Sequence, residues 1–149
     1  MEQAITSVGR DGFDGVYSAN DGMAGGAIAA MKSAGIDPRD VPVTGQDAEV
    51  AALQRLLTGE QLMTIYQPIS EIAATSAELA VPLATGEEQP AITRARVDNG
   101  FEEVPSVLLD TVVITRDNIR ERVIADGFAT AEQICTADYA EACRAAGIS

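Results

Sequence analysis

Hydrophobic and polar positions change in blocks along the first part of the chain. Residues 16–31 read VYSANDGMAGGAIAAM. A short apolar run stops at the polar pair Asn20-Asp21, and apolar residues then recur at steps of three and four. This order predicts a strand, a polar junction and a helix, which together form the repeating unit of parallel α/β sheets.

The same block occurs two more times. The strands are expected at Val16–Ala19, Val41–Gly45 and Leu62–Tyr66, and the helices at 23–34, 50–58 and 69–84. The polar residues that follow the three strands are Asn20, Asp47 and Gln67. Because the carboxyl ends of parallel strands converge on one edge of a sheet, these side chains are expected where α/β proteins bind small ligands.

The three polar side chains offer complementary hydrogen bonds. The carboxylate of Asp47 accepts, while the amides of Asn20 and Gln67 donate and accept. That set suits a neutral, polyhydroxylated ligand and contains no arranged nucleophile or base. Helix N-caps are the alternative interpretation, and spacing alone favours N-caps, because Asn and Asp are common at helix starts.

The order of elements changes after Gly86. Extended chain is expected at 92–97 and 104–114 around a tight turn at 98–100, and a further helix runs from Thr115 to near Gly127. Pro82 predicts a kink or an early stop in the helix that contains it. The Ala- and acid-rich tail predicts one bent helix or two short ones.

Cys135 and Cys143 are the two cysteines of the chain. On one straight helix their Cα atoms would lie about 12 Å apart, which is too far for a disulfide. If the chain bends between them, a disulfide can form, and that would fit a secreted protein. Two unpaired buried thiols are the alternative, and the spacing leaves both open.

Composition excludes several functions. Ten basic and 23 acidic residues give a net charge of -13, which repels nucleic acid and anionic membrane surfaces. Histidine is absent, which excludes a Ser-His-Asp triad, a Cys-His pair and an ordinary catalytic zinc site. Neither a GxGxxG nor a GxxxxGK[ST] phosphate loop is present, and no cofactor is expected. The N-terminal residues MEQAITSVG lack the basic and apolar regions of a signal peptide.

Four stretches carry a resemblance to a known family. They read VYSANDGMAGGAIAAMKSAG, VPVTGQDAEVAALQRLLTGEQLMTIYQP, NGFEEVPSVLL and ITRDNIRERVIADGF. In this order they resemble the C-terminal part of xylose-type sugar-binding proteins of bacterial ABC importers, from Phe13 to about Phe128. The resemblance implies a type I periplasmic-binding-protein fold. This is a Rossmann-like, parallel three-layer α/β fold, here mainly the C-terminal lobe plus a crossover segment of the other lobe.

The resemblance also implies roles for individual residues. Asn20 of the ANDG segment and Asp47 of the TGQDAE segment match sugar-hydroxyl ligands of the family, which leaves Asp21 as the helix cap. The residue before the proline of MTIYQP is another ligand. It is typically Lys in xylose binders, whereas this chain has Gln67, and ribose-type relatives use Gln at the corresponding strand end.

The implied domain organisation has four parts. Residues 1–67 form βα units of the C-terminal lobe, and 68–104 hold a helix and a strand of the N-terminal lobe. Residues 105–128 return to the first lobe, and 129–149 form a Cys-containing helical tail outside the resemblance. Family members are about twice as long, so the chain is expected to be truncated, and to pair with a missing N-terminal lobe or with itself.

The implied function is binding of a monosaccharide as the solute-binding component of an importer, without catalysis. Partners would be ABC permease subunits, and the location would be extracellular, periplasmic or on a cell-surface lipoprotein. A sugar-sensing effector domain of a transcription regulator shares the fold and is the alternative. A small α/β enzyme with Asp21 or Asp47 as general base is a weaker alternative, because the chain lacks His and any metal or cofactor motif.

Overall fold

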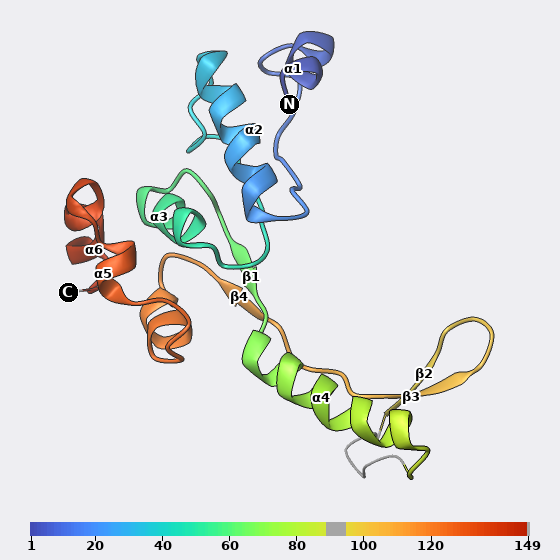
Figure 1. Cartoon of the computed structure of the whole chain (residues 1–149). Helices are drawn as coiled ribbons and strands as arrows, with labels where there is room; N and C mark the ends of the chain where they lie inside the picture. The colour runs from blue at the N-terminus through green and yellow to red at the C-terminus, as the bar shows by residue number, and fades with distance from the viewer. Residues whose placement is uncertain (89–94, 149) are drawn as a thin grey trace. The chain divides into compact units, whose positions relative to one another are not determined.

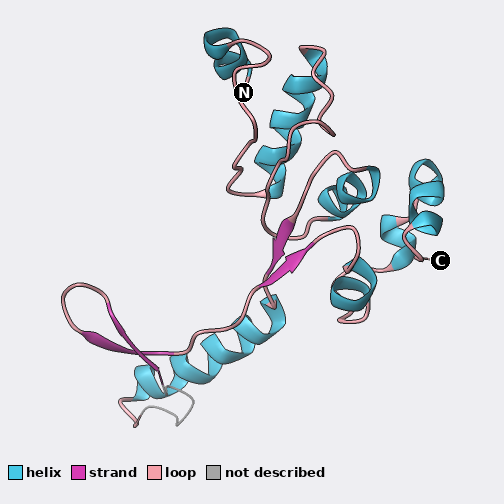
Figure 2. Ribbon diagram, turned by 180° about the vertical axis from the view of Figure 1, so that it is seen from behind, coloured by secondary structure: helices cyan, strands magenta, loops and turns pink. Residues whose placement is uncertain are grey.

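The computed structural model of this protein describes residues 1–88 and 95–148. The chain divides into two compact units, one made of Met1–Tyr66 with Val112–Ser149 and the other of Gln67–Thr111. Figures 1 and 2 show the helices and strands of the described residues. None of the helices over these residues is long and apolar enough to cross a membrane.

The first two predicted strands are shorter in the structure. Each is reduced to one position of a parallel bridge between Val16 and Val43. Val16 N donates to the carbonyl of Pro42 at 2.9 Å, and Thr44 N donates to the carbonyl of Val16 at 3.0 Å. Pro42 has no amide hydrogen, and the amide of Ser18 donates to Thr44 Oγ1 at 3.0 Å instead of to a backbone carbonyl. The regular ladder therefore ends after one bridge.

The third predicted strand is confirmed as β1, Thr64–Tyr66, which pairs antiparallel with β4, Val112–Ile114. On its other side the chain leading into β1 lies along the second extended segment. Leu62 N donates to Val43 O at 2.9 Å, and Ile65 N donates to Gly45 O at 3.2 Å. The extended segments of the first unit thus lie side by side in chain order, followed by β4.

The first unit begins with three helices, of which the second and third lie close to the positions predicted at 23–34 and 50–58. They are α1 (Glu2–Val8), α2 (Asp21–Ser33) and α3 (Val50–Thr58). One face of α2 buries Ala24, Ile28 and Met31 in a small core that also contains Val41 and Val43. Because α2 carries both apolar and polar residues, burial of its apolar face against the extended segments fixes which side of the helix faces the core.

Helix α3 packs into the larger core of the first unit. Its buried face consists of Ala52, Leu53, Leu56 and Leu57, and it ends at Gly59 in a left-handed conformation with φ 80°. The partners in this core include Ile114, Ile119, Val123, Ile134 and Cys143. These buried side chains come from β4 and from the C-terminal elements, so α3 joins the sheet to the tail.

The C-terminal elements follow β4. The predicted helix after Thr115 is a wider π-helical turn, η1 (Arg120–Ile124). The tail is bent rather than straight and consists of α5 (Ala131–Ile134), η2 (Ala137–Tyr139) and α6 (Ala140–Ala145). Cys135 and Cys143 are joined by a disulfide, and their Cα atoms are 5.9 Å apart.

The second unit holds helix α4, Ile69–Thr85, and an antiparallel hairpin of β2, Ala95–Asp98, and β3, Glu103–Ser106. Helix α4 continues three residues beyond Pro82 and ends at Gly86, so the predicted early stop at Pro82 is wrong. A proline lacks the amide hydrogen that would bond to the preceding turn, but the residues after it can still continue the helix to its end. The predicted strand positions 92–94 lie outside the described residues.

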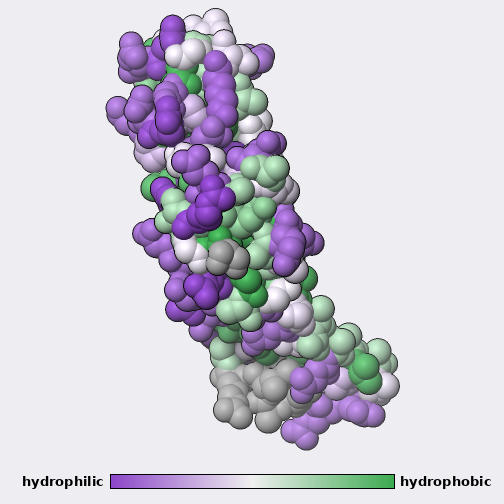
Figure 3. All heavy atoms as spheres, turned by 90° about the vertical axis from the view of Figure 1, so that its left-hand side faces the viewer, coloured by the Kyte–Doolittle hydropathy of each residue, from purple (hydrophilic) through white to green (hydrophobic). Residues whose placement is uncertain are grey.

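Several large apolar side chains of α4 are exposed, and none of its residues is buried. Those with the greatest exposure are Ile69, Val81 and Leu83, at 57%, 61% and 66%. On the face of the molecule drawn in Figure 3, hydrophobic residues lie among hydrophilic ones.

Candidate functional site

Asn20 is the N-cap of helix α2. Its side-chain oxygen Oδ1 accepts a hydrogen bond from Met23 N at 2.8 Å, which satisfies one amide of the first helical turn. The carbonyl of Asn20 accepts a second hydrogen bond from Ser18 Oγ, also at 2.8 Å. Over the described residues, no hydrogen bond uses the side-chain nitrogen Nδ2 of Asn20.

The capping role expected for Asp21 is wrong. Asp21 is the first residue of α2, and its carboxylate accepts hydrogen bonds from distant parts of the chain rather than from the first turn. The side chain is fully buried. The side-chain oxygen of either Asn20 or Asp21 could in principle cap the helix. The carboxylate of Asp21 is bound by other parts of the chain, and Asn20 makes the cap.

Asp47 lies in the loop between the second extended segment and α3, and its side chain is exposed. Its backbone has φ 101°, and Ala48 after it has φ 52°, so two consecutive non-glycine residues occupy the left-handed region. The amide of Asp47 donates to Ile65 O at 2.8 Å. Within the described chain, the carboxylate of Asp47 makes no hydrogen bond, so both oxygens face solvent or a ligand.

Asn20 and Asp47 stand on neighbouring strand ends. The residues beside them are hydrogen-bonded, since Asp21 N donates to Gln46 O at 2.9 Å. The structure therefore brings together two of the three predicted site residues at the carboxyl edge of the extended segments. Gln67 directly follows β1 and is the first residue of the second unit.

The chemistry of this edge is that of hydrogen bonding. An amide donor at Asn20 and a carboxylate acceptor at Asp47 can contact adjacent hydroxyl groups of a ligand, one accepting and one donating. In the described residues, no group of three or more Cys, Asp or Glu side chains comes together as a metal site. A hollow of about 450 Å³ in the first unit lies at the opposite strand ends, next to Val41 and Leu62, and does not include this pair.

Sequence reasoning missed the buried residues whose side chains hydrogen-bond to Asp21, next to Asn20. Gln61 and Thr64 are buried and donate to the carboxylate of Asp21 at 2.8 and 2.9 Å. Arg55 donates to Gln61 Oε1 at 2.9 Å and to the carbonyl of Asp21 at 2.8 Å. A polar residue at a strand or helix position that should be apolar is the signal that could have found them.

The two glycines in the middle of α2 have different surroundings. A Cβ at Gly25 would lie 3.1 Å from Nη1 of Arg55, whereas a Cβ at Gly26 would meet nothing within 4 Å. Gly25 therefore makes room for the guanidinium of Arg55 on α3, and Gly26 is open.

Fold and site together define a class of protein. A mixed α/β unit presents an amide and a carboxylate on adjacent strand ends. In open α/β sheets, ligands bind beyond the carboxyl ends of the strands. Residues 1–88 match the family model described as a periplasmic binding protein domain, and the chain belongs to that family.

Individual relatives make the likeness more specific. The chain is 42% identical over 134 residues to the D-xylose-binding periplasmic protein of Haemophilus influenzae, covering 90% of this chain and 39% of that protein. It is also 42% identical over 128 residues to the D-xylose-binding periplasmic protein of Escherichia coli K12, covering 86% and 38%. The resemblance to xylose-type sugar-binding proteins is confirmed, and the chain spans about two fifths of the length of these relatives.

A solved structure shares the fold. It is a carbohydrate-transporter solute-binding protein from Chloroflexus aurantiacus in complex with D-glucose, and it superposes with a TM-score of 0.69 at 31% identity. The match covers 89% of this chain and 38% of the other. The predicted α/β class is thus confirmed for the part of such a protein that this chain spans.

Proposed function

We propose that this chain forms one side of a monosaccharide-binding site in the solute-binding component of an ABC importer. The observation that carries the proposal is the pair Asn20 and Asp47, held on adjacent strand ends by the contact between Asp21 and Gln46, each with unused hydrogen-bonding atoms. Gln67, at the end of the next strand, is proposed as the third ligand. Each would hydrogen-bond a sugar hydroxyl, and no chemical step is involved.

The second unit supports a two-lobed arrangement in the proposal. Gln67–Thr111 is a separate compact unit, and its helix α4 buries none of its apolar side chains. We propose that these side chains pack against an N-terminal lobe, and that this lobe supplies the remaining sugar contacts. The present chain would cross from one lobe to the other near Gln67-Pro68 and return near Val104-Pro105.

The proposed location is outside the cytoplasm. The disulfide between Cys135 and Cys143 supports this, because disulfides persist in oxidising compartments such as the periplasm. The relatives named above are periplasmic proteins. ABC permease subunits are the proposed protein partners, on the same family basis.

Calorimetric titration of the chain with D-xylose and D-glucose tests the proposal. The decisive variants are Asn20→Asp, which keeps the helix cap and removes the Nδ2 donor, and Asp47→Asn, which removes the charged acceptor. Each lost hydrogen bond to a charged or buried group is expected to weaken binding about 10- to 100-fold. Overall affinity is expected to be low, because one side of the site alone excludes little water.

Asp40→Asn is the matched control. It makes the same chemical change as Asp47→Asn on an exposed residue that precedes the strand segment instead of following it. Asp40→Asn should bind as the unchanged chain does. Equal sugar affinity in the unchanged chain, Asn20→Asp and Asp47→Asn would overturn the assigned roles, and absence of any sugar response would overturn the function.

A further inference from the structure

The buried carboxylate of Asp21 makes all of its hydrogen bonds within the described chain. Its Oδ1 accepts from Gln61 Nε2 at 2.8 Å, and its Oδ2 accepts from Thr64 Oγ1 at 2.9 Å and from Glu49 N at 3.0 Å. An ionisable side chain is costly to bury, and three donors offset that cost. The partners come from two stretches of the chain, Glu49 before α3 and residues 61–64 at the start of β1, so this carboxylate joins both stretches to α2.

One of these partners is the loop that carries Asp47. Glu49 N is bound by Asp21, and Ala48 N donates to Thr64 Oγ1 at 3.2 Å. The hydroxyl of Thr64 donates to Asp21 and accepts from Ala48 N. It therefore links the carboxylate of Asp21 to the backbone of the loop by two hydrogen bonds in series. Two consecutive amides after Asp47 are therefore fixed by one buried cluster.

The loop needs such a hold because its backbone is strained. Left-handed conformations at non-glycine residues cost on the order of 1–3 kcal/mol each and persist only where surrounding contacts enforce them. Asp47 and Ala48 both lie in this region, with φ 101° and 52°. The hydrogen bonds of the cluster to Ala48 N and Glu49 N, together with that of Asp47 N to Ile65 O, are the backbone contacts of the loop in this conformation.

The chain also keeps room for the cluster. A Cβ added at Gly45 would lie 2.1 Å from Asp21 Oδ1 and 2.4 Å from Gln61 Nε2. On the other side, Arg55 donates to Gln61 and to the carbonyl of Asp21, which holds the amide of Gln61 with its nitrogen toward the carboxylate.

We propose that Asp21 and Thr64 are positioning residues that hold the Asp47 carboxylate in its ligand-binding direction before the sugar arrives. The use of that carboxylate rests on the proposed function, whereas the hold on the loop does not. A preformed loop raises affinity because binding then pays no ordering cost. If loss of the cluster leaves the loop in the competent conformation about a tenth of the time, apparent affinity falls about tenfold.

Thr64→Val and Thr64→Ser test the proposal as a matched pair in the 149-residue chain. Valine keeps the shape of threonine and removes the relay hydroxyl, while serine keeps the hydroxyl. Asp21→Asn is a third variant, in which one acceptor oxygen becomes a donor that faces another donor. Thermal unfolding of each variant verifies that the first unit remains folded.

The first measurement is amide hydrogen exchange by NMR without sugar. Exchange at Ala48 and Glu49 is expected to rise at least tenfold in Thr64→Val and Asp21→Asn and to stay near the original rate in Thr64→Ser. Unchanged protection of both amides in Thr64→Val and Asp21→Asn would overturn the proposal. This measurement tests whether the cluster restrains the loop, and its result does not depend on whether the chain binds sugar.

The second measurement is calorimetric titration with D-xylose and D-glucose. Thr64→Val should bind about tenfold more weakly than Thr64→Ser, and this difference should disappear when both are combined with Asp47→Asn. A loss of the same size with and without the Asp47 carboxylate would show that Thr64 does not act through Asp47 and would overturn that step. Failure of the unchanged chain to bind either sugar would count against the proposed function, and the exchange result would stand.

Discussion

At the scale of single residues, a small cluster of buried polar side chains is hydrogen-bonded to the loop that follows Asp47. Asp21, Gln61 and Thr64 are almost completely buried, yet their hydrogen bonds converge on the loop that presents Asp47. Because each buried polar atom here has a partner, removal of one leaves another unsatisfied, at a cost of about 1–3 kcal/mol. Small changes next to this cluster should therefore have large effects.

Gly45→Ala is such a change. Its Cβ would overlap Asp21 Oδ1 and Gln61 Nε2, and neither side chain can move without losing buried hydrogen bonds. We expect a loss of roughly 1–3 kcal/mol in the free energy of unfolding, measured by urea denaturation. Gly26→Ala is the control, since a Cβ there meets nothing within 4 Å and alanine favours a helix interior by about 0.5–1 kcal/mol. Equal stabilities of the two variants would contradict the packing argument.

Tyr66 gives a pH-dependent test. Its hydroxyl donates to the carboxylate of Asp126, and this hydrogen bond, together with burial and the nearby negative charge, raises the pKa of Tyr66 to about 12. In an unfolded chain the pKa of tyrosine is about 10. Since the folded pKa is the higher one, the contribution of Tyr66 to stability is complete below pH about 10 and is lost as pH rises from about 10 to 12.

Tyr66→Phe should therefore lower stability by about 0.5–1.5 kcal/mol at neutral pH and flatten the decline of stability above pH about 10. Urea denaturation across this pH range measures both effects. Tyr17→Phe is the control, because Tyr17 is 88% exposed. If Tyr66→Phe and the unchanged chain lose stability in parallel above pH 10, the hydrogen bond to Asp126 does not cause the decline.

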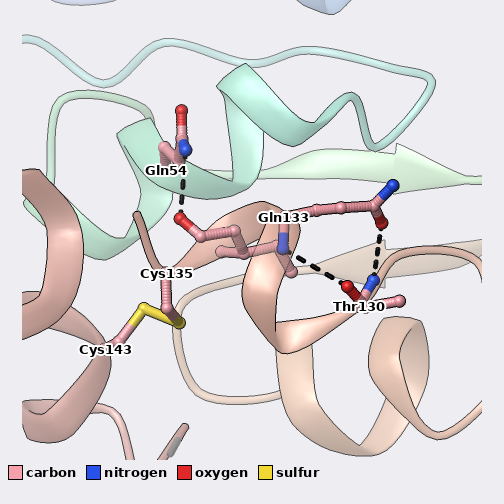
Figure 4. Close-up of a disulfide and its surroundings, with 6 residues drawn as sticks. Gln54, Thr130, Gln133, Cys135 and Cys143 are labelled. Atoms are coloured by element: carbon pink, nitrogen blue, oxygen red, sulfur yellow. Dashed lines mark hydrogen bonds between the residues drawn. A yellow bond between two sulfur atoms is a disulfide. The ribbon is translucent and has the colours of Figure 1, made fainter. Parts of the chain in front are cut away.

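At the scale of elements, the tail of the first unit is closed on itself by a covalent bond and joined to α3 by a hydrogen bond. The disulfide closes the turn of α5, η2 and α6, and Gln54 Nε2 of α3 donates to the carbonyl of Ile134 at 3.0 Å (Figure 4). A capping box at Thr130 and Gln133 starts α5, where each residue bonds the backbone amide of the other. Helix α5 has only four residues, so its position depends on these contacts rather than on its own propensity.

Replacement of both Cys135 and Cys143 by Ser should destabilise the tail by roughly 2–3 kcal/mol, the entropic value for a loop of this length. Denaturation of the oxidised chain, the reduced chain and the double variant measures the loss. Reduction of the original chain should match the double variant, and reductant should leave the double variant unchanged. A double variant as stable as the oxidised chain would show that the packing of α5 and α6 on α3 is sufficient.

At the scale of the whole molecule, the exposed apolar side chains of α4 are the main departure from a self-sufficient monomer. A helix with several exposed apolar side chains and no buried residue has no core of its own to face. The chain spans about two fifths of the length of its xylose-binding relatives. In the proposed two-lobed arrangement, an N-terminal lobe would cover these exposed side chains of α4.

We expect the chain to self-associate in a concentration-dependent way through the exposed apolar side chains of α4. Size-exclusion chromatography with light scattering measures the mass, and Val81→Glu with Leu83→Glu should shift it toward the monomer. Val8→Glu is the control, because Val8 is similarly exposed on α1, in the other unit. A well-folded monomer at all concentrations, with or without the changes on α4, would contradict this expectation.

Much of the fold could be predicted from the pattern of residues. Helices α2, α3 and α4 were found from apolar residues at steps of three and four, and Gly59 and Gly86 end α3 and α4 as expected. The strands were less well predicted, because hydrogen bonds between separate segments define a strand. At Val16 and Val43 the ladder stops after one bridge since the amide of Ser18 turns to a side chain.

The site divides in the same way between local and distant causes. By itself the sequence determined that polar residues follow the strands, that two cysteines lie eight positions apart, and that no histidine chemistry exists. Only the tertiary structure decided that Asn20 caps α2, that Asp21 supports the loop of Asp47, and that the cysteines are joined. The partners of the Asp21 carboxylate lie 28, 40 and 43 positions away, and no local pattern specifies contacts between segments so far apart.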